Sequence, residues 1–177
     1  MRNTHVVGMI VVTISLLIVS GQLGRAEDET KPSQDGGTGI MEQPGRLFDM
    51  KVPEGFDAVP NEEPGIFKWK KGSAEIYLVV GDLFVESGDL LFKALRKAAE
   101  DGEKIEKVET VKIDGGQAML FKEKPGKDPE RPLTWRLIVL MDKKMINVDF
   151  TAPLKDFESF RGDFQKAVES FKLKSDS

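Results

Sequence analysis

The sequence predicts an α+β domain in which an antiparallel β-sheet is flanked by helices, an α/β/α sandwich. Several short segments alternate apolar and polar residues with the period of a strand, and the turns between them are too short for crossover helices. The last segment instead repeats phenylalanine every three or four residues, as an amphipathic helix does. All 11 Phe, both Trp and the only Tyr follow residue 46, so we place the domain at residues 46–177.

Residues 1–26 have the form of a secretory signal peptide. Arg2 supplies a positive start, and the apolar run at residues 6–19 is shorter than the roughly 20 residues of a comfortable membrane span. Small residues stand just before a cleavage site between Ala26 and Glu27. We therefore expect an exported protein, periplasmic or extracellular. An uncleaved leader that anchors the chain to the membrane is the alternative.

Residues 27–45 have the composition of a disordered, acidic Gly/Pro-rich linker. Ile40 and Met41 are its only large apolar residues, too few to offset the entropy of ordering the segment. The glycines at 36–39 resemble part of a phosphate-binding loop, but no strand precedes them and no helix follows. We interpret them as part of the linker.

Composition removes several classes of function. The chain has no Cys, and its single histidine, His5, lies in the leader, so a disulfide framework, a thiolate nucleophile and the commonest zinc ligands are missing. A net charge of −4 gives no basic surface for nucleic acid. We expect no catalytic residues, no metal and no cofactor, and no nucleic-acid partner.

The domain begins with a predicted strand at residues 47–52, where Phe48, Met50 and Val52 alternate with polar residues. A turn at residues 53–55 ends it. Strands at residues 66–70 and 74–81 follow, and the three residues between them require an antiparallel hairpin.

A helix is predicted over residues 89–100, with Ser87 as its N-cap and Gly102 just beyond its end. We assign its buried face to Leu91, Ala94, Leu95 and Ala98. Its basic residues, Lys93, Arg96 and Lys97, could face an acidic partner, but a solvated helix face is the favoured interpretation.

Four strands in hairpins come next. Residues 104–113 and 117–124 flank an Asp-Gly-Gly turn, and residues 134–141 are apolar on both faces, which predicts a central, covered strand. A turn leads to a strand at residues 146–151. Beyond Pro153, a terminal helix lays an aromatic stripe on the sheet, with core packing favoured over a ligand site. The stripe consists of Phe157, Phe160, Phe164, Val168 and Phe171.

Three stretches resemble the PsbP-like fold family, which includes extrinsic photosystem II subunits, exported bacterial proteins of the DcrB type and a Ran-binding import factor. They are the opening FDMKVPEGF at 48–56, the hairpin VKIDGGQA at 111–118, and the ending from Phe150 to Phe171. The resemblance implies a non-catalytic domain that binds other proteins or helps assemble them. No binding residue of the family maps onto these stretches, and the lipid-accepting cysteine of its lipoprotein members is missing here.

Few residues suggest chemistry. Lys70 or Lys71 with Ser73 is the nearest approach to a base and a nucleophile, yet they flank a predicted hairpin turn. Carboxylate pairs cannot be assigned among 30 acidic residues. The charged loop at residues 122–132 is either ordinary surface or a docking element, and surface is favoured. It includes Gly126-Lys127-Asp128, which resembles only a fragment of a phosphate-binding loop.

We expect an exported, non-enzymatic protein-binding or assembly factor of the cell envelope, whose partner is another envelope or exported protein. A carrier of a small apolar ligand or lipid is the second hypothesis, motivated by the phenylalanines and seven Met. A carboxylate-based hydrolase is the third.

Overall fold

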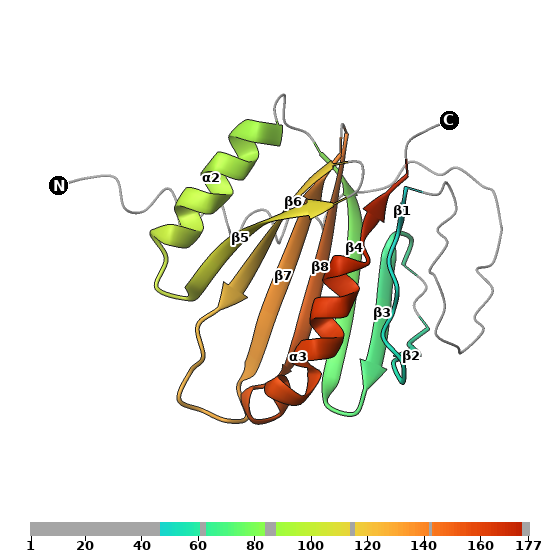
Figure 1. Ribbon diagram of the computed structural model, residues 1–177, viewed down its shortest axis with the longest axis vertical. Coiled ribbons are helices and arrows are strands. Elements are labelled where there is room, and N and C mark those ends of the chain that lie inside the picture. The colour runs from blue at the N-terminus through green and yellow to red at the C-terminus, as the bar shows by residue number, and fades with distance from the viewer. Residues whose placement is uncertain (1–46, 61–62, 84–87, 114–115, 142, 175–177) are drawn as a thin grey trace.

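The computed structural model describes residues 47–60, 63–83, 88–113, 116–141 and 143–174 (Figure 1). The expected cleavage site between Ala26 and Glu27, the linker and the proposed N-cap Ser87 lie outside these residues.

A seven-stranded antiparallel sheet forms the centre of the domain, in the order β2-β3-β4-β8-β7-β6-β5. The α+β fold class is therefore confirmed. The pairing of β4 with β8 joins the first and second halves of the sequence. The strands are β2 (Asp57–Ala58), β3 (Ile66–Lys71), β4 (Ala74–Asp82), β5 (Ile105–Ile113), β6 (Gly116–Glu123), β7 (Pro132–Leu140) and β8 (Lys144–Pro153).

The predicted hairpins are confirmed. β3 pairs with β4, β5 with β6, and β7 with β8, all antiparallel. Gly72 closes the first hairpin with a φ of +58°, a conformation that glycine adopts without steric cost. Within the seven-stranded sheet, β2, which pairs with β3, was not expected. Two residues are too short a run to show a period.

The opening strand is shorter than predicted and belongs to a separate sheet. β1 (Phe48–Asp49) pairs with β9 (Lys172–Leu173), a strand that was not predicted. The expected alternation is present, because Phe48, Met50 and Val52 are buried. The ring of Phe48 stacks on Phe171 at 5.1 Å, so the two ends of the described chain lie side by side.

α3 (Leu154–Glu169) lays the predicted aromatic stripe on one face of the sheet. Phe157, Phe164 and Val168 are buried, and Phe171 is buried just beyond the helix. The rings contact one another at 5.4–6.3 Å, together with Trp135, Phe56 and Phe150. Protein side chains thus pack this interface, as the core interpretation predicted.

The N-terminus of α3 is capped by the charged loop between β6 and β7. Pro153 provides no side-chain cap. Instead, the first helical amides of Leu154 and Lys155 donate to the carbonyl oxygens of Arg131 and Pro129, at 3.0 and 3.1 Å. These bonds satisfy donors that a helix start otherwise leaves without partners.

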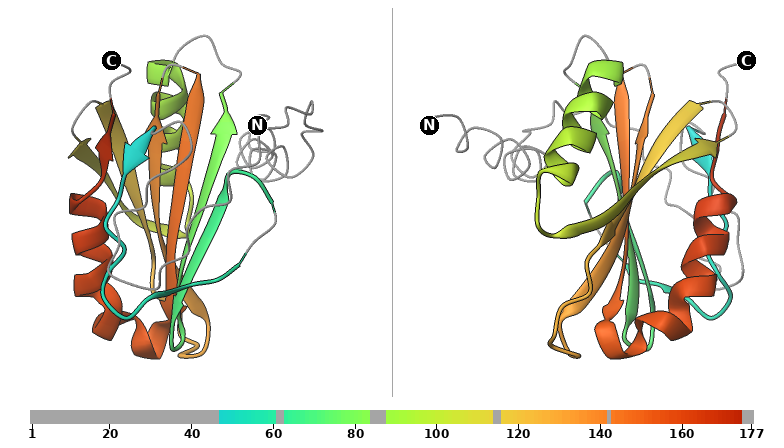
Figure 2. Two further views of the ribbon diagram at one scale, coloured as in Figure 1. Left: turned by 90° about the vertical axis from the view of Figure 1, so that its right-hand side faces the viewer. Right: turned by 60° about the vertical axis from the view of Figure 1, so that its left-hand side comes forward.

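α2 (Gly88–Glu100) covers the opposite face of the sheet (Figure 2). It packs through Phe92, Leu95 and Ala99 onto a smaller apolar cluster around Met119 and Phe121. The prediction that Ala94 belongs to the buried face is wrong, because this residue is exposed. The large Phe92 side chain turns the helix so that the stripe made with Leu95 and Ala99 meets the sheet.

β7 lies inside the sheet, as predicted, but it is not covered along its whole length. Ile138 is buried on the α2 face. Thr134 and Arg136 lie earlier on that face and are only half-buried, since α2 packs nearer the other end of the strand. Polar residues occupy this uncovered part of the sheet.

Candidate functional site

A groove lies between α3 and the outer strands β5 and β6 on the α3 face of the sheet. It arises because α3 packs mainly on β4, β7 and β8, whereas the sheet continues past the helix through β6 to β5. The groove encloses about 510 Å³. The buried side chains of Leu133, Trp135 and Phe157 lie beneath its base, and charged side chains of both signs form its rims.

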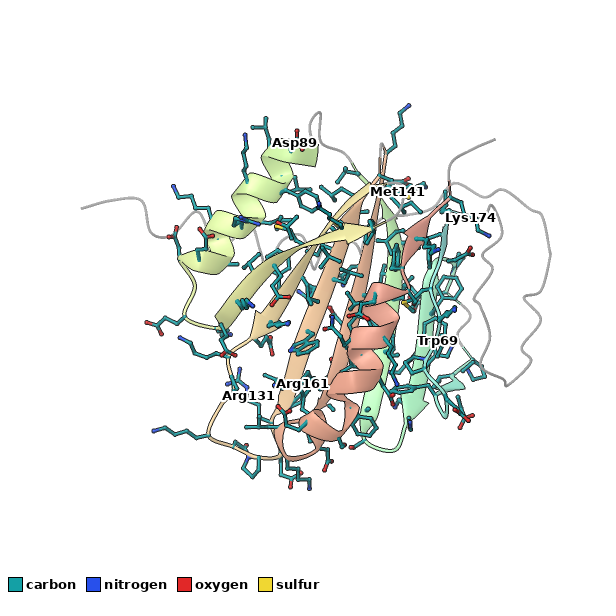
Figure 3. The ribbon with its side chains drawn as sticks, in the orientation of Figure 1. Trp69, Asp89, Arg131, Met141, Arg161 and Lys174 are labelled. Carbon is teal, nitrogen blue, oxygen red and sulfur yellow. The ribbon has the colours of Figure 1, made fainter. Side chains whose placement is uncertain are left out.

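Trp135 sits at the base of the groove beneath two cations. Its side chain is almost wholly buried, with an exposed fraction of 5%, and its ring meets Phe157 edge-on at 5.4 Å. Lys122 Nζ lies 4.4 Å from the centre of the ring, and Arg161 Cζ lies 5.8 Å from it. The ring attracts both cations through its quadrupole. Figure 3 shows Arg161 on the side of α3 that faces β7.

Ion pairs continue from these cations to both rims. Glu109 on β5 accepts hydrogen bonds from Lys122, at 3.0 Å, and Lys107, at 2.7 Å. Arg161 pairs with Glu158 one turn earlier on α3. A chain of charged groups therefore crosses the groove from β5 to α3, with a cation on each side of Trp135 and a carboxylate beyond each cation.

The pKa of Glu109 is lowered from its usual value, chiefly by the hydrogen bond from Lys107 and also by Lys122, against the opposing effect of burial. The pKa of Lys107 is raised, mainly by the same hydrogen bond. Glu109 is thus held as a carboxylate. General acid catalysis would require the opposite shift.

This shift predicts a pH dependence. The pKa of Glu109 in the folded state is lower than its unfolded-state pKa, which is near 4.5. Glu109 therefore stabilises the fold above the unfolded-state pKa, and this stabilisation is lost as the pH falls through the folded-state pKa. We expect the Glu109→Gln variant to lose less stability below about pH 4.5 than the unsubstituted protein does. The difference should be less than about 1 kcal/mol, because solvent screens the ion pairs of Glu109 with the two lysines. Urea unfolding at several pH values measures this. Glu103→Gln, an exposed residue before β5, is the control, and equal pH profiles for both variants would contradict the prediction.

The lysines and serine singled out from the sequence do not form a catalytic pair. Lys71 Nζ binds Asp163 Oδ2 at 3.0 Å and the carbonyl oxygen of Glu54 at 2.9 Å. Ser73 Oγ donates to Asp156 Oδ2 at 2.8 Å, and Lys70 pairs with Glu75. Through Lys71 and Ser73, the β3–β4 turn is fastened to α3.

The other sequence candidates have separate surroundings. Arg96 of α2 donates to Thr110 Oγ1 at 2.6 Å, whereas Lys93 and Lys97 are exposed. The first residues of the charged loop line the groove: Lys122 and Glu123, which belong to β6, and Pro125 just beyond that strand. Sequence reasoning missed the groove itself, since Lys122, Trp135 and Arg161 come together only through strand pairing and helix packing.

Within 47–60, 63–83, 88–113, 116–141 and 143–174, no group of three or more His, Cys, Asp or Glu is placed to hold a metal ion. In the same part of the chain, neither helix has the length and apolar character needed to cross a membrane.

The sequence matches no protein-family profile and no curated protein. The fold, however, is similar to that of solved structures. Cyanobacterial PsbP (CyanoP) from Synechocystis sp. PCC 6803 superposes with a TM-score of 0.56 at 12% identity, over 83% of this chain and 98% of that one. LpqN of Mycobacterium tuberculosis, involved in cell envelope biogenesis, gives a TM-score of 0.55 at 10% identity, over 72% and 83%.

A Bacteroides thetaiotaomicron protein matches with a TM-score of 0.54 at 14% identity, over 80% of this chain and 50% of that one. The resemblance to the PsbP-like fold is thereby confirmed, as a likeness of fold.

Proposed function

We propose that this chain is an exported, non-catalytic protein-binding or assembly factor of the cell envelope, and that it binds its partner through the groove between α3 and β5–β6. The observation that carries the proposal is the lining of the groove. An aromatic and aliphatic base surrounded by charged rims is the usual composition of a protein-binding surface. Arginine is one of the residue types that most often dominate binding energy, and Arg161 is exposed there above the buried ring of Trp135.

The groove is poorly suited to catalysis. Its lining, drawn from the described residues, includes no Ser, Thr, Tyr, His or Cys, so it offers no hydroxyl, thiol or imidazole nucleophile. One of its carboxylates, Glu109, accepts hydrogen bonds from two lysines and is held ionised. These features favour binding over the hydrolase hypothesis.

The envelope location is supported by the form of residues 1–26 and by one structural neighbour, since LpqN is described as involved in cell envelope biogenesis. The apolar-ligand hypothesis has no comparable support, because the phenylalanines that motivated it pack against one another.

Site-specific photo-cross-linking in an exporting host tests the proposal. A benzophenone amino acid replaces Lys107 on the groove rim or, as a control, Lys93 on α2, which is also exposed. We expect one discrete protein adduct from position 107 and none from position 93. Failure to form an adduct at 107, or identical adducts from both positions, would count against a groove-bound protein partner.

A further inference from the structure

We infer that the partner protein adds an extended segment to the free edge of β5, as a further strand of the seven-stranded sheet. This inference rests on the proposed function and specifies how the partner binds, because β5 forms the outer rim of the groove. The added strand lies beside Glu106, Lys107 and Glu109, the rim residues that β5 contributes.

The two edges of the sheet differ. One edge ends in β2, a strand of two residues, and very short strands are a common way to end a sheet. The other edge ends in β5, which has nine residues, none of them buried. Only β6 pairs with β5, and within the described parts of the chain no further backbone–backbone hydrogen bond reaches residues 105–113. In the right-hand view of Figure 2, β5 crosses in front of the other strands, with α2 on one side and α3 on the other.

An open edge of this kind specifies the form of its occupant. Alternate residues of an edge strand point their N–H and C=O groups away from the sheet. The protein segment that matches this row of groups is another extended backbone with the same spacing. An α-helix uses its backbone groups in its own hydrogen bonds and has few to offer. The occupant is therefore a strand.

From Lys107 to Ile113, β5 is regular enough to accept a strand. These seven residues pair with β6 in an unbroken register, and the irregularity of this ladder lies before them, between Ile105 and Lys107. Four of the seven side chains are Val, Thr or Ile, the β-branched residues that favour strands. Edges that avoid pairing are often distorted by a bulge or interrupted by proline, and neither occurs within this stretch.

The charges along β5 specify residues of the added strand. Lys107 and Glu109 share the α3 face of the sheet, and Lys112 lies on the other face. Acidic residues opposite the two lysines and a basic residue opposite Glu109 form favourable cross-strand pairs, whereas like charges there are unfavourable. Every neighbouring pair in this sheet is antiparallel. An antiparallel partner strand therefore carries the order acidic-x-x-basic-x-acidic.

A second copy of the chain fits this edge less well. A two-fold axis at Glu109 would place this carboxylate opposite itself, which is unfavourable. An axis at Val108 would bring the irregular start of β5 into the ladder after three residue pairs. An axis at Thr110 would place lysines opposite apolar residues. Residues 27–45 of the chain do not contain the order acidic-x-x-basic-x-acidic either.

Peptide display tests the inference. The full chain, purified from an exporting host, selects from a library of random peptides of about ten residues, long enough to span β5. Enriched peptides should carry the order acidic-x-x-basic-x-acidic among β-branched and aromatic residues. A library without enriched peptides, or enriched peptides that become helical on binding by circular dichroism, would overturn the inference.

Stepwise N-methylation of an enriched peptide identifies the binding mode, because each methyl group removes one backbone N–H. In an added antiparallel strand, only alternate N–H groups bond to β5. Methylation at every second residue should therefore weaken binding at least about tenfold, and methylation at the residues between should be tolerated. Sensitivity that does not alternate would contradict an added strand.

A charge reversal on β5 locates the binding. In Lys107→Glu/Glu109→Lys, affinity for an enriched peptide should fall at least about tenfold and should return when the two opposing charges of the peptide are exchanged. Lys68→Glu/Glu75→Lys is the matched control, because it reverses an ion pair of 2.8 Å on β3 and β4 and should leave affinity unchanged. Circular dichroism checks that both variants fold. Unchanged affinity in the β5 variant would exclude this edge as the site.

The two hypotheses fail separately. A protein adduct from position 107 without enrichment of extended peptides would retain the proposed function and reject the added strand. A dimer of the purified chain, with an adduct between two copies at position 107, would assign the edge to a second copy and also reject the partner strand. No enriched peptide and no adduct would reject both hypotheses.

Discussion

Replacing Phe164 with alanine is expected to destabilise the domain by about 3–5 kcal/mol, the usual cost of removing a fully enclosed phenylalanine. Phe164 has no exposed surface. Its ring lies 5.5–6.2 Å from those of Phe56, Phe150, Phe157 and Phe160, so it joins α3, the sheet and the segment after β1. Truncation leaves a cavity that these surrounding elements cannot all close.

Such a loss is a large share of the roughly 5–15 kcal/mol that stabilises a typical domain. Chemical denaturation followed by tryptophan fluorescence measures it, because Trp135 reports on the same core. Phe160→Ala is the matched control on the same helix, where the ring is only partly buried and a smaller loss is expected. Equal losses for the two variants would show that Phe164 is not the centre of this cluster.

Removing the Arg136 side chain should lower the free energy of unfolding by about 2 kcal/mol, the second largest effect that we expect. Breaking a fully buried ion pair costs roughly 3–5 kcal/mol, and the loss is smaller here because the Arg136 side chain is partly exposed. Its guanidinium makes a bidentate pair with Asp149, with Nε–Oδ1 and Nη2–Oδ2 distances of 2.6 and 2.7 Å. The hydrogen bond to Asp149 raises the pKa of Arg136, so the arginine is charged at all working pH values. In Arg136→Leu, the partly buried carboxylate of Asp149 loses this partner and retains a long hydrogen bond from Asn147 Nδ2, at 3.5 Å.

A double-mutant cycle isolates this interaction. The Arg136→Leu/Asp149→Leu variant should recover most of the stability lost by either single substitution, because it removes both charges together. Purely additive losses would mean that the pair contributes no coupling.

Periodicity explains which elements could be predicted. The α3 stripe and the β3–β4, β5–β6 and β7–β8 hairpins each repeat their pattern over several residues, and each was predicted with its pairing. β2 and β9 have two residues each, too few for a repeat. The misassigned Ala94 shows a related limit, because neighbouring positions on a helix compete for the same face and the contact with Met119 and Phe121 decides between them.

The sequence by itself determined the α+β class, the hairpins and the aromatic face of α3, since these depend on residues near one another in the chain. Only the tertiary structure decided the strand order, the pairing of β1 with β9 and the groove. Lys122, Trp135 and Arg161 belong to three elements, and their contact depends on where α3 crosses the sheet. Many residues share in setting that crossing, so no local pattern encodes it.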